Sequence, residues 1–173
     1  AAGLHRSLKE SAREAVRANV TIDNVLPGSV DAERIGGPMK KQAAEKGVAL
    51  ALAIAPQCAA ALIDPGSAER MVARLASAVV GLARPGERIA LELEPGEGLK
   101  PETWLTVTRP AVVKGQDEEA LFDACDLPGE EDGAQPLLGL GFTLRMVRGV
   151  AESCGGRLVI APDCFRVRLR AAA

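Results

Sequence analysis

The 173-residue sequence contains few aromatic residues: three phenylalanines, one tryptophan and no tyrosine, 2% in all. Proteins that bind single-stranded nucleic acids stack bases on aromatic side chains, so this scarcity argues against that class of function. The net charge of -2 likewise offers no basic surface for nucleic acid. Hydrophobic residues nevertheless make up 47% of the chain, so alanine, valine, leucine and isoleucine must build most of the core.

Metal-ligating residues are also sparse and badly spaced for a zinc site. The cysteines, Cys58, Cys125, Cys154 and Cys164, form no C-x-x-C motif, and the single histidine, His5, has none of them nearby in the sequence. We expect no zinc site, and we interpret Cys58 and Cys154 as small buried residues of a reduced, cytoplasmic protein.

Long apolar segments are missing as well. No apolar run reaches the roughly 18 to 20 residues that cross a bilayer, and the first residues do not have the pattern of a signal peptide. We therefore expect no membrane contact within this chain. The length and the hydrophobic content indicate one principal domain with a short appendage.

The most informative stretch is LGLGFTLRMVRGVAESCGGRLVI, residues 138–160. Gly139 and Gly141 flank Leu140 where a helix should begin, and glycine there allows backbone amides to face an anion such as a phosphate. Apolar residues at helical spacing then predict an amphipathic helix that ends at Gly155, followed by a strand. A G-x-G before a helix is also found in ordinary turns, so the motif alone does not establish a nucleotide site.

The whole stretch resembles the glycine box of the histidine-kinase catalytic domain, a member of the GHKL ATPase superfamily, with the pattern GxGLGLxIVxxxVxxxGGxIxV. The strand after it, with Phe165, Val167 and Leu169 alternating with arginines, is similar to the family's closing strand. The resemblance covers residues 30–171. It implies an α/β fold, a two-layer sandwich of the histidine-kinase ATPase (Bergerat) type with a mixed sheet and three helices on one face.

Earlier segments follow the order of elements in the same family. A helix ending at Gly47 precedes the segment GVALALAIA, whose alternation predicts a strand with one well-packed face. Residues 63–65, IDP, resemble the entry to the family's central helix. We predict that helix over residues 67–84, with Ser67 as its N-cap.

Two nucleotide motifs of the family are lost. The N-box asparagine, which coordinates the magnesium of ATP in the family, falls on Ala78 or Val79, and neither side chain can bind a metal. The D-x-G-x-G box falls on residues 108–112. Thr108 therefore replaces the aspartate that accepts a hydrogen bond from adenine, and Pro110 replaces a glycine.

The segment over residues 123–138 is acidic and rich in turn residues, and it lies in the place of the family's ATP lid. Its acidic residues 130–132 would repel phosphates, so we interpret it as a solvated surface loop. We interpret Arg109 and Lys114 as ordinary surface cations. Residues 117–119 are the nearest carboxylates that could replace the lost aspartate, and we predict that they begin a helix instead.

Residues 4–26 predict one long helix with an apolar seam. We divide the chain into a partial dimerisation-type helix, residues 1–28, and a histidine-kinase-like catalytic/ATP-binding domain, residues 29–173. The helix resembles the second helix of the family's dimerisation hairpin and implies a homodimer. The residues that follow the family's phosphoacceptor are missing after His5, so we interpret this histidine as a solvated residue.

Together these observations indicate the C-terminal part of a two-component sensor histidine kinase-like protein with a degenerate catalytic domain. We expect no catalytic residue, no metal site, no cofactor and no nucleic acid, and a response regulator or a partner kinase as the binding partner. One alternative is a residual ATP-binding kinase in which divergent residues contact ATP and magnesium, and another is an ATP-independent histidine phosphotransferase. The candidate nucleotide-contact residues are Thr108, Gly139, Leu140, Gly141 and Phe142.

Overall fold

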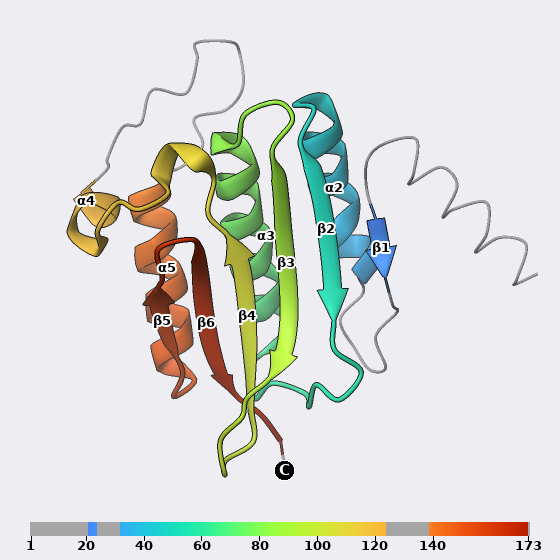
Figure 1. The fold of residues 1–173 in the computed structure, drawn as a ribbon. Helices are drawn as coiled ribbons and strands as arrows, with labels where there is room; N and C mark the ends of the chain where they lie inside the picture. The colour runs from blue at the N-terminus through green and yellow to red at the C-terminus, as the bar shows by residue number, and fades with distance from the viewer. Residues whose placement is uncertain (1–20, 24–31, 124–138, 173) are drawn as a thin grey trace, which may run out of the picture.

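The computed structural model describes residues 21–23, 32–123 and 139–172 (Figure 1). A mixed six-stranded sheet runs through these residues in the order β1-β2-β3-β4-β6-β5. Its strands are β1 (Thr21–Asp23), β2 (Ala49–Ile54), β3 (Arg88–Pro95), β4 (Glu102–Thr108), β5 (Arg157–Ile160) and β6 (Cys164–Arg170). The helices are α2 (Ala32–Glu45), α3 (Pro65–Leu82), α4 (Glu118–Asp123) and α5 (Leu140–Ser153), with a 3-10 turn, η1 (Ala111–Val113).

The helices α2, α3 and α5 cover one face of the sheet, which confirms the predicted two-layer α/β sandwich (Figure 1). Strands β1, β2 and β3 are parallel to one another, whereas β3, β4, β6 and β5 pair antiparallel. Parallel neighbours need a crossover, and α2 and α3 are the elements that precede β2 and β3 in the chain.

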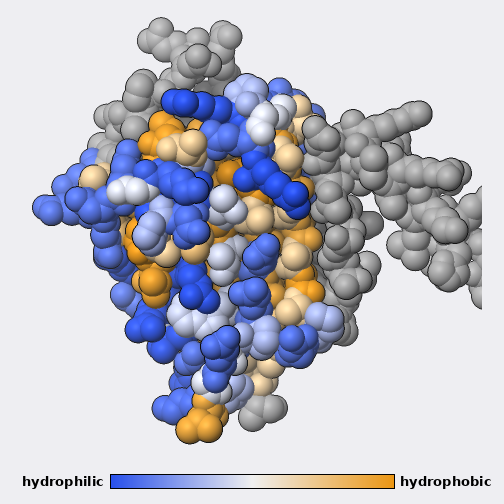
Figure 2. All heavy atoms as spheres, viewed as in Figure 1, coloured by the Kyte–Doolittle hydropathy of each residue, from blue (hydrophilic) through white to orange (hydrophobic). Residues whose placement is uncertain are grey.

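Alternation along β4 separates the core from the uncovered face of the sheet. Leu105 and Val107 are buried toward the helices, whereas Trp104 and Thr106 are only partly covered. Figure 2 shows this uncovered face as hydrophilic over much of β4 and β6, with a more hydrophobic strip along β2. Phe165 of β6 is the largest fully buried side chain of the described core.

The central helix α3 begins earlier than the sequence predicts. Its N-cap is Asp64, whose Oδ2 accepts a hydrogen bond from the Ser67 amide at 2.8 Å, and Pro65 occupies the first turn. The prediction of Ser67 as the cap is therefore wrong. A carboxylate followed by proline is the stronger start signal, because proline has no amide hydrogen that would need a partner there.

Glycines end two helices as predicted. Gly155 follows α5 with a φ of +69°, and the amide of Gly156 donates to the carbonyl of Ala151 at 2.8 Å. Gly47 ends α2 with a φ of +67°. Both positions have left-handed backbone, which glycine adopts without the steric cost of a side chain.

The N-terminal prediction needs one correction. Most of residues 4–26 lies outside the described residues, and the same is true of His5, Cys125 and residues 130–132. However, Thr21–Asp23 form β1, which pairs parallel with β2 and places Ile22 beside Leu52. The predicted helix therefore does not continue through these residues. Threonine and isoleucine are β-branched and favour a strand where a sheet edge is available.

No helix in the described part of the chain is long and apolar enough to span a membrane. Cys58 and Cys154 are free thiols, and both are partly exposed. The expectation that these two cysteines are buried is therefore wrong, because each follows a turn or a helix end rather than a core position. Partial burial, with the nearby charge of Glu94, still raises the pKa of the Cys58 thiol.

Replacing Asp64 with alanine should lower the melting temperature at neutral pH, because the Ser67 amide loses its acceptor. Hydrogen bonds from Ser67, chiefly from its backbone amide, lower the pKa of Asp64 below its ordinary value of 3.8. The stabilisation is therefore fully present above that value and is lost as the pH falls through the folded-state pKa.

The measurement is thermal denaturation by circular dichroism from about pH 7 to about pH 2.5. The difference in Tm between the wild type and Asp64→Ala should shrink toward the acid end. Asp64→Asn is the control, since its amide oxygen still accepts a hydrogen bond but does not titrate in this range. A Tm difference that stays constant down to the lowest pH would contradict a capping carboxylate.

Candidate functional site

The glycine turn and the helix predicted around residue 140 are both present. Gly139 is the N-cap of α5, with a φ of -50°, and its carbonyl accepts a hydrogen bond from the Thr143 amide at 3.1 Å. Leu140 and Gly141 are buried, whereas Phe142 is 49% exposed. The structure therefore brings four of the five predicted contact residues together at the first turn of α5.

Gly141 is required here for a reason that the sequence does not reveal. A Cβ atom at this position would lie 2.5 Å from the carbonyl oxygen of Phe122 and 3.1 Å from that of Leu121. Its φ is not in the left-handed region. Glycine is therefore required here because no side chain fits, and not because of its backbone freedom. The backbone group that approaches Gly141 so closely is the C-terminal turn of α4.

Side chains of α5 hold α4 in this position. The guanidinium of Arg145 donates to the Phe122 carbonyl, and Arg148 forms an ion pair with Glu118. The Arg148 guanidinium also lies 4.0 Å from the centroid of the Phe122 ring. The helix itself begins as predicted, since Asp117 caps it by accepting from the Ala120 amide at 2.8 Å. The carboxylate of Asp117 therefore caps α4, and that of Glu118 holds α4 against α5.

Ala78 and Val79, the two candidate N-box positions, both lie in the hydrophobic core. Ala78 is 7% exposed and Val79 is 0% exposed. Both alignments of the central helix therefore place an apolar, buried side chain where the family has its magnesium ligand. Among the described residues, no group of three histidine, cysteine, aspartate or glutamate side chains could hold a metal ion.

Thr108 lies apart from the glycine turn. It ends β4 in the row of Trp104 and Thr106, opposite to the buried row, and its hydroxyl accepts a hydrogen bond from the Ala90 amide at 3.0 Å. Helix α5 covers the other face of the sheet (Figure 1). The hydroxyl of Thr108 thus stabilises the pairing of β3 with β4, and its contact with a nucleotide remains a prediction.

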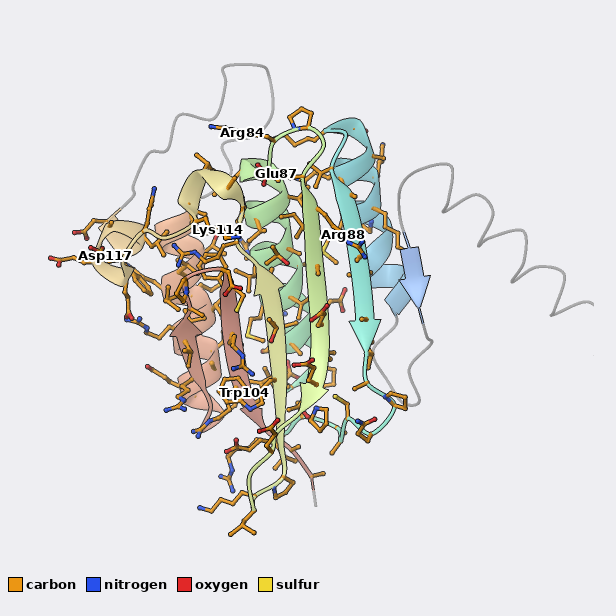
Figure 3. The ribbon with its side chains drawn as sticks, in the orientation of Figure 1. Arg84, Glu87, Arg88, Trp104, Lys114 and Asp117 are labelled. Atoms are coloured by element: carbon orange, nitrogen blue, oxygen red, sulfur yellow. The ribbon has the colours of Figure 1, made fainter. Side chains whose placement is uncertain are left out.

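Arg109 is not a surface cation, so that interpretation is wrong. It is 3% exposed, because it continues the inward row of Leu105 and Val107. The alternation of β4 was the signal that could have revealed this, since residue 109 has the same parity as the buried positions. Lys114, by contrast, is exposed, as predicted (Figure 3).

Glu87 lies at the same end of the sheet as Arg84 and Lys114 (Figure 3). Its Oε2 accepts a hydrogen bond from the amide of Ala111 at 3.1 Å. The start of β3 is thereby tied to η1, the turn at the position where the sequence resemblance puts the first glycine box. The proline at position 110 precedes this turn with a φ of -60°, and its preset geometry suits the start of a 3-10 helix.

A groove of about 300 Å³ lies between α3 and α5. Its floor is apolar, and the guanidinium groups of Arg70 and Arg74 belong to exposed residues at its rim. Phe142, from the first turn of α5, adds a half-exposed aromatic ring. The lining residues are Ser67, Arg70, Met71, Arg74, Phe142, Met146 and Val150.

Solved histidine kinases share this fold. The mycobacterial sensor histidine kinase MprB is 17% identical, with 82% of this chain and 97% of that chain covered at a TM-score of 0.51. A histidine kinase from Burkholderia phymatum is 15% identical over 100% of this chain and 82% of its own, with a TM-score of 0.56. The nucleotide-free catalytic domain of histidine kinase ThkA is 10% identical, with coverages of 80% and 90% and a TM-score of 0.55.

No family model matches the sequence, and no curated protein matches it either. The likeness to the solved kinases therefore shows the fold, and it confirms the resemblance drawn from the glycine-rich stretch. At these identities the likeness does not extend to activity or to individual site residues.

Gly141→Ala should destabilise the protein by more than about 1 kcal/mol, because the added methyl group would overlap the Phe122 carbonyl. Gly149→Ala is the matched control in the same helix, where a Cβ would meet nothing within 4 Å. Removing an exposed glycine from a helix interior should stabilise by about 0.5 to 1 kcal/mol. Urea denaturation measures both changes, and a Gly141→Ala variant as stable as the wild type would rule out the described packing of α4 on α5.

Proposed function

We propose that this chain is the C-terminal part of a two-component, histidine kinase-like signalling protein whose catalytic domain has lost nucleotide chemistry. In this proposal it acts in the cytoplasm by binding a response regulator or a partner kinase and so regulates a phosphorelay. The histidine-kinase fold supports the signalling context. The loss of nucleotide chemistry is argued from the chain's own residues.

The observation that carries the proposal is the burial of Ala78 and Val79 in the core. A magnesium ion in a nucleotide site needs oxygen ligands, and it keeps several waters even when one or two protein groups bind it. An alanine and a valine packed into the core provide no oxygen. Phosphoryl transfer depends almost wholly on positioning and on metal electrostatics, so losing this ligand should abolish or severely slow the reaction.

Adenine recognition is weakened in the same way. Thr108 replaces the family's aspartate, and its hydroxyl is engaged with the backbone of Ala90. A lost hydrogen bond to a charged group costs about 1.5 to 3 kcal/mol. That corresponds to about a ten- to hundredfold loss of affinity before the missing metal ligand is considered.

The groove between α3 and α5 supports a role in protein binding. It combines an apolar floor with Phe142 and two arginines at the rim. Such a surface suits an amphipathic segment that presents apolar side chains flanked by acidic ones, because the apolar groups fill the groove and the carboxylates meet the guanidinium groups. A partner bound in this groove would lie beside the first turn of α5, next to the predicted nucleotide contacts.

A residual ATP-binding kinase is the second candidate, and one observation favours it. The first turn of α5 is formed as the glycine box predicts, with Gly139 as its cap. The amide end of a helix carries a partial positive charge that stabilises phosphate oxygens. This candidate needs other residues to replace both lost ligands.

Calorimetric titration of the chain with ATP and magnesium should show no heat of binding at millimolar nucleotide. ADP and a magnesium-free titration are the controls for nucleotide specificity, and an active histidine-kinase catalytic domain is the positive control. Micromolar binding that requires magnesium would refute the proposal and establish the residual kinase instead.

A further inference from the structure

Arg109 is a buried cation that forms no close ion pair in the described part of the chain, although the nearby charge of Asp163 favours its charged form. Arg109 is 3% exposed. Among the described residues, no acidic side chain forms an ion pair with its guanidinium within 4.0 Å. Burial disfavours the charged form and lowers the pKa of Arg109. Because arginine keeps its charge in proteins, the surrounding groups must stabilise a cation.

Backbone carbonyls and one aromatic ring provide that stabilisation. The guanidinium donates to the carbonyl of Ala161 at 2.6 Å, to that of Gln116 at 2.9 Å, and to that of Val113. Its Cζ atom lies 5.4 Å from the centroid of the fully buried Phe165 ring. Three acceptors and a π face form a receptor for one planar cation.

The receptor is made from two turns that are distant in the sequence. One turn, residues 113–116, follows β4, and the other, residues 161–163, joins β5 to β6. One backbone hydrogen bond connects the two turns, from the Gly115 amide to the carbonyl of Pro162 at 3.1 Å. The Arg109 amide also donates to the carbonyl of Asp163 at 2.8 Å, which ties the end of β4 to the second turn. The guanidinium bridges the same two turns from the inside.

We propose that the Arg109 guanidinium is a built-in ligand, filling a cation site at the carboxyl end of β4 so that these two turns close on each other without a nucleotide. The inference rests on the proposed function in one respect only: the end of β4 and the turn after it, where the resemblance puts the first glycine box, work without ATP. The site selects a planar guanidinium over a point charge, because its two Nη atoms donate to carbonyls of different turns, one to Ala161 and the other to Val113 and Gln116.

The experiment is chemical rescue of Arg109→Gly, measured by thermal denaturation. The variant should melt at least about 5 °C below the wild type, because three buried or partly buried hydrogen bonds lose their donor. Millimolar methylguanidinium, far below denaturing concentrations, should restore at least half of that loss. An equal concentration of methylammonium should not, and Arg109→Lys should remain close to Arg109→Gly.

Arg84→Gly is the matched control, since Arg84 is an exposed arginine at the same end of the sheet (Figure 3). Its Tm should stay near that of the wild type and should not respond to methylguanidinium. An unchanged Tm for Arg109→Gly, or equal rescue by methylammonium, would overturn the inference.

A measurement on the wild type covers the case in which Arg109→Gly does not fold. Nitrogen-15 NMR of the arginine side chains should show one guanidinium with separate, slowly exchanging Nη protons, and Arg109→Lys should remove those signals. If all arginines show averaged, rapidly exchanging Nη protons, the built-in ligand is refuted. Neither experiment contains nucleotide, so their results do not depend on whether the chain binds ATP. Magnesium-dependent ATP binding by the wild type would refute the proposed function, whereas the rescue and NMR results test only the role of Arg109.

Discussion

The burial of α3 is the constraint on which the rest of the structure depends. This helix contacts α2 on one side, α5 on the other and β3 beneath, and Leu75, Ala76 and Val79 are completely buried. A polar side chain at such a position would need its own partner or would cost about 1 to 3 kcal/mol. The apolar side chains that pack this helix into the core are therefore the same side chains that leave these positions without a metal ligand.

The order of elements could be predicted because it depends on local chemistry. Period-two alternation identified β2 and β6, and helical spacing identified α5. Gly47 and Gly155 marked the helix ends because left-handed backbone excludes most other residues. The same local chemistry placed the candidate residues at the first turn of α5, since a cap and its helix are neighbours in the sequence.

The features that escaped prediction depend on contacts between distant segments. Gly141 is small because the end of α4 approaches it, and the intervening sequence does not reveal that contact. The alternation of β4 gives Arg109 an inward position, but its acceptors, the carbonyls of Val113, Gln116 and Ala161, are brought together only by the fold. The strand at Thr21–Asp23 exists because β2 offers it an edge. In each case the residue type permits several environments, and only the tertiary fold selects one.

The strand order has a consequence for how the chain reaches this structure. Strands β3 and β4 are joined by a short hairpin and can pair as soon as both exist, whereas β6 enters between β4 and β5 after α4 and α5 have formed the connection. Pairing over long sequence separation is slow because the loop must close before any contact is gained. During synthesis, the ring of Phe165 and the carbonyl of Ala161, which complete the contacts of Arg109, become available only after α5 and β5 have been made. Until β6 has paired with β4, the interior of the sheet stays open and the guanidinium of Arg109 has only the nearby carbonyls of Val113 and Gln116 as acceptors.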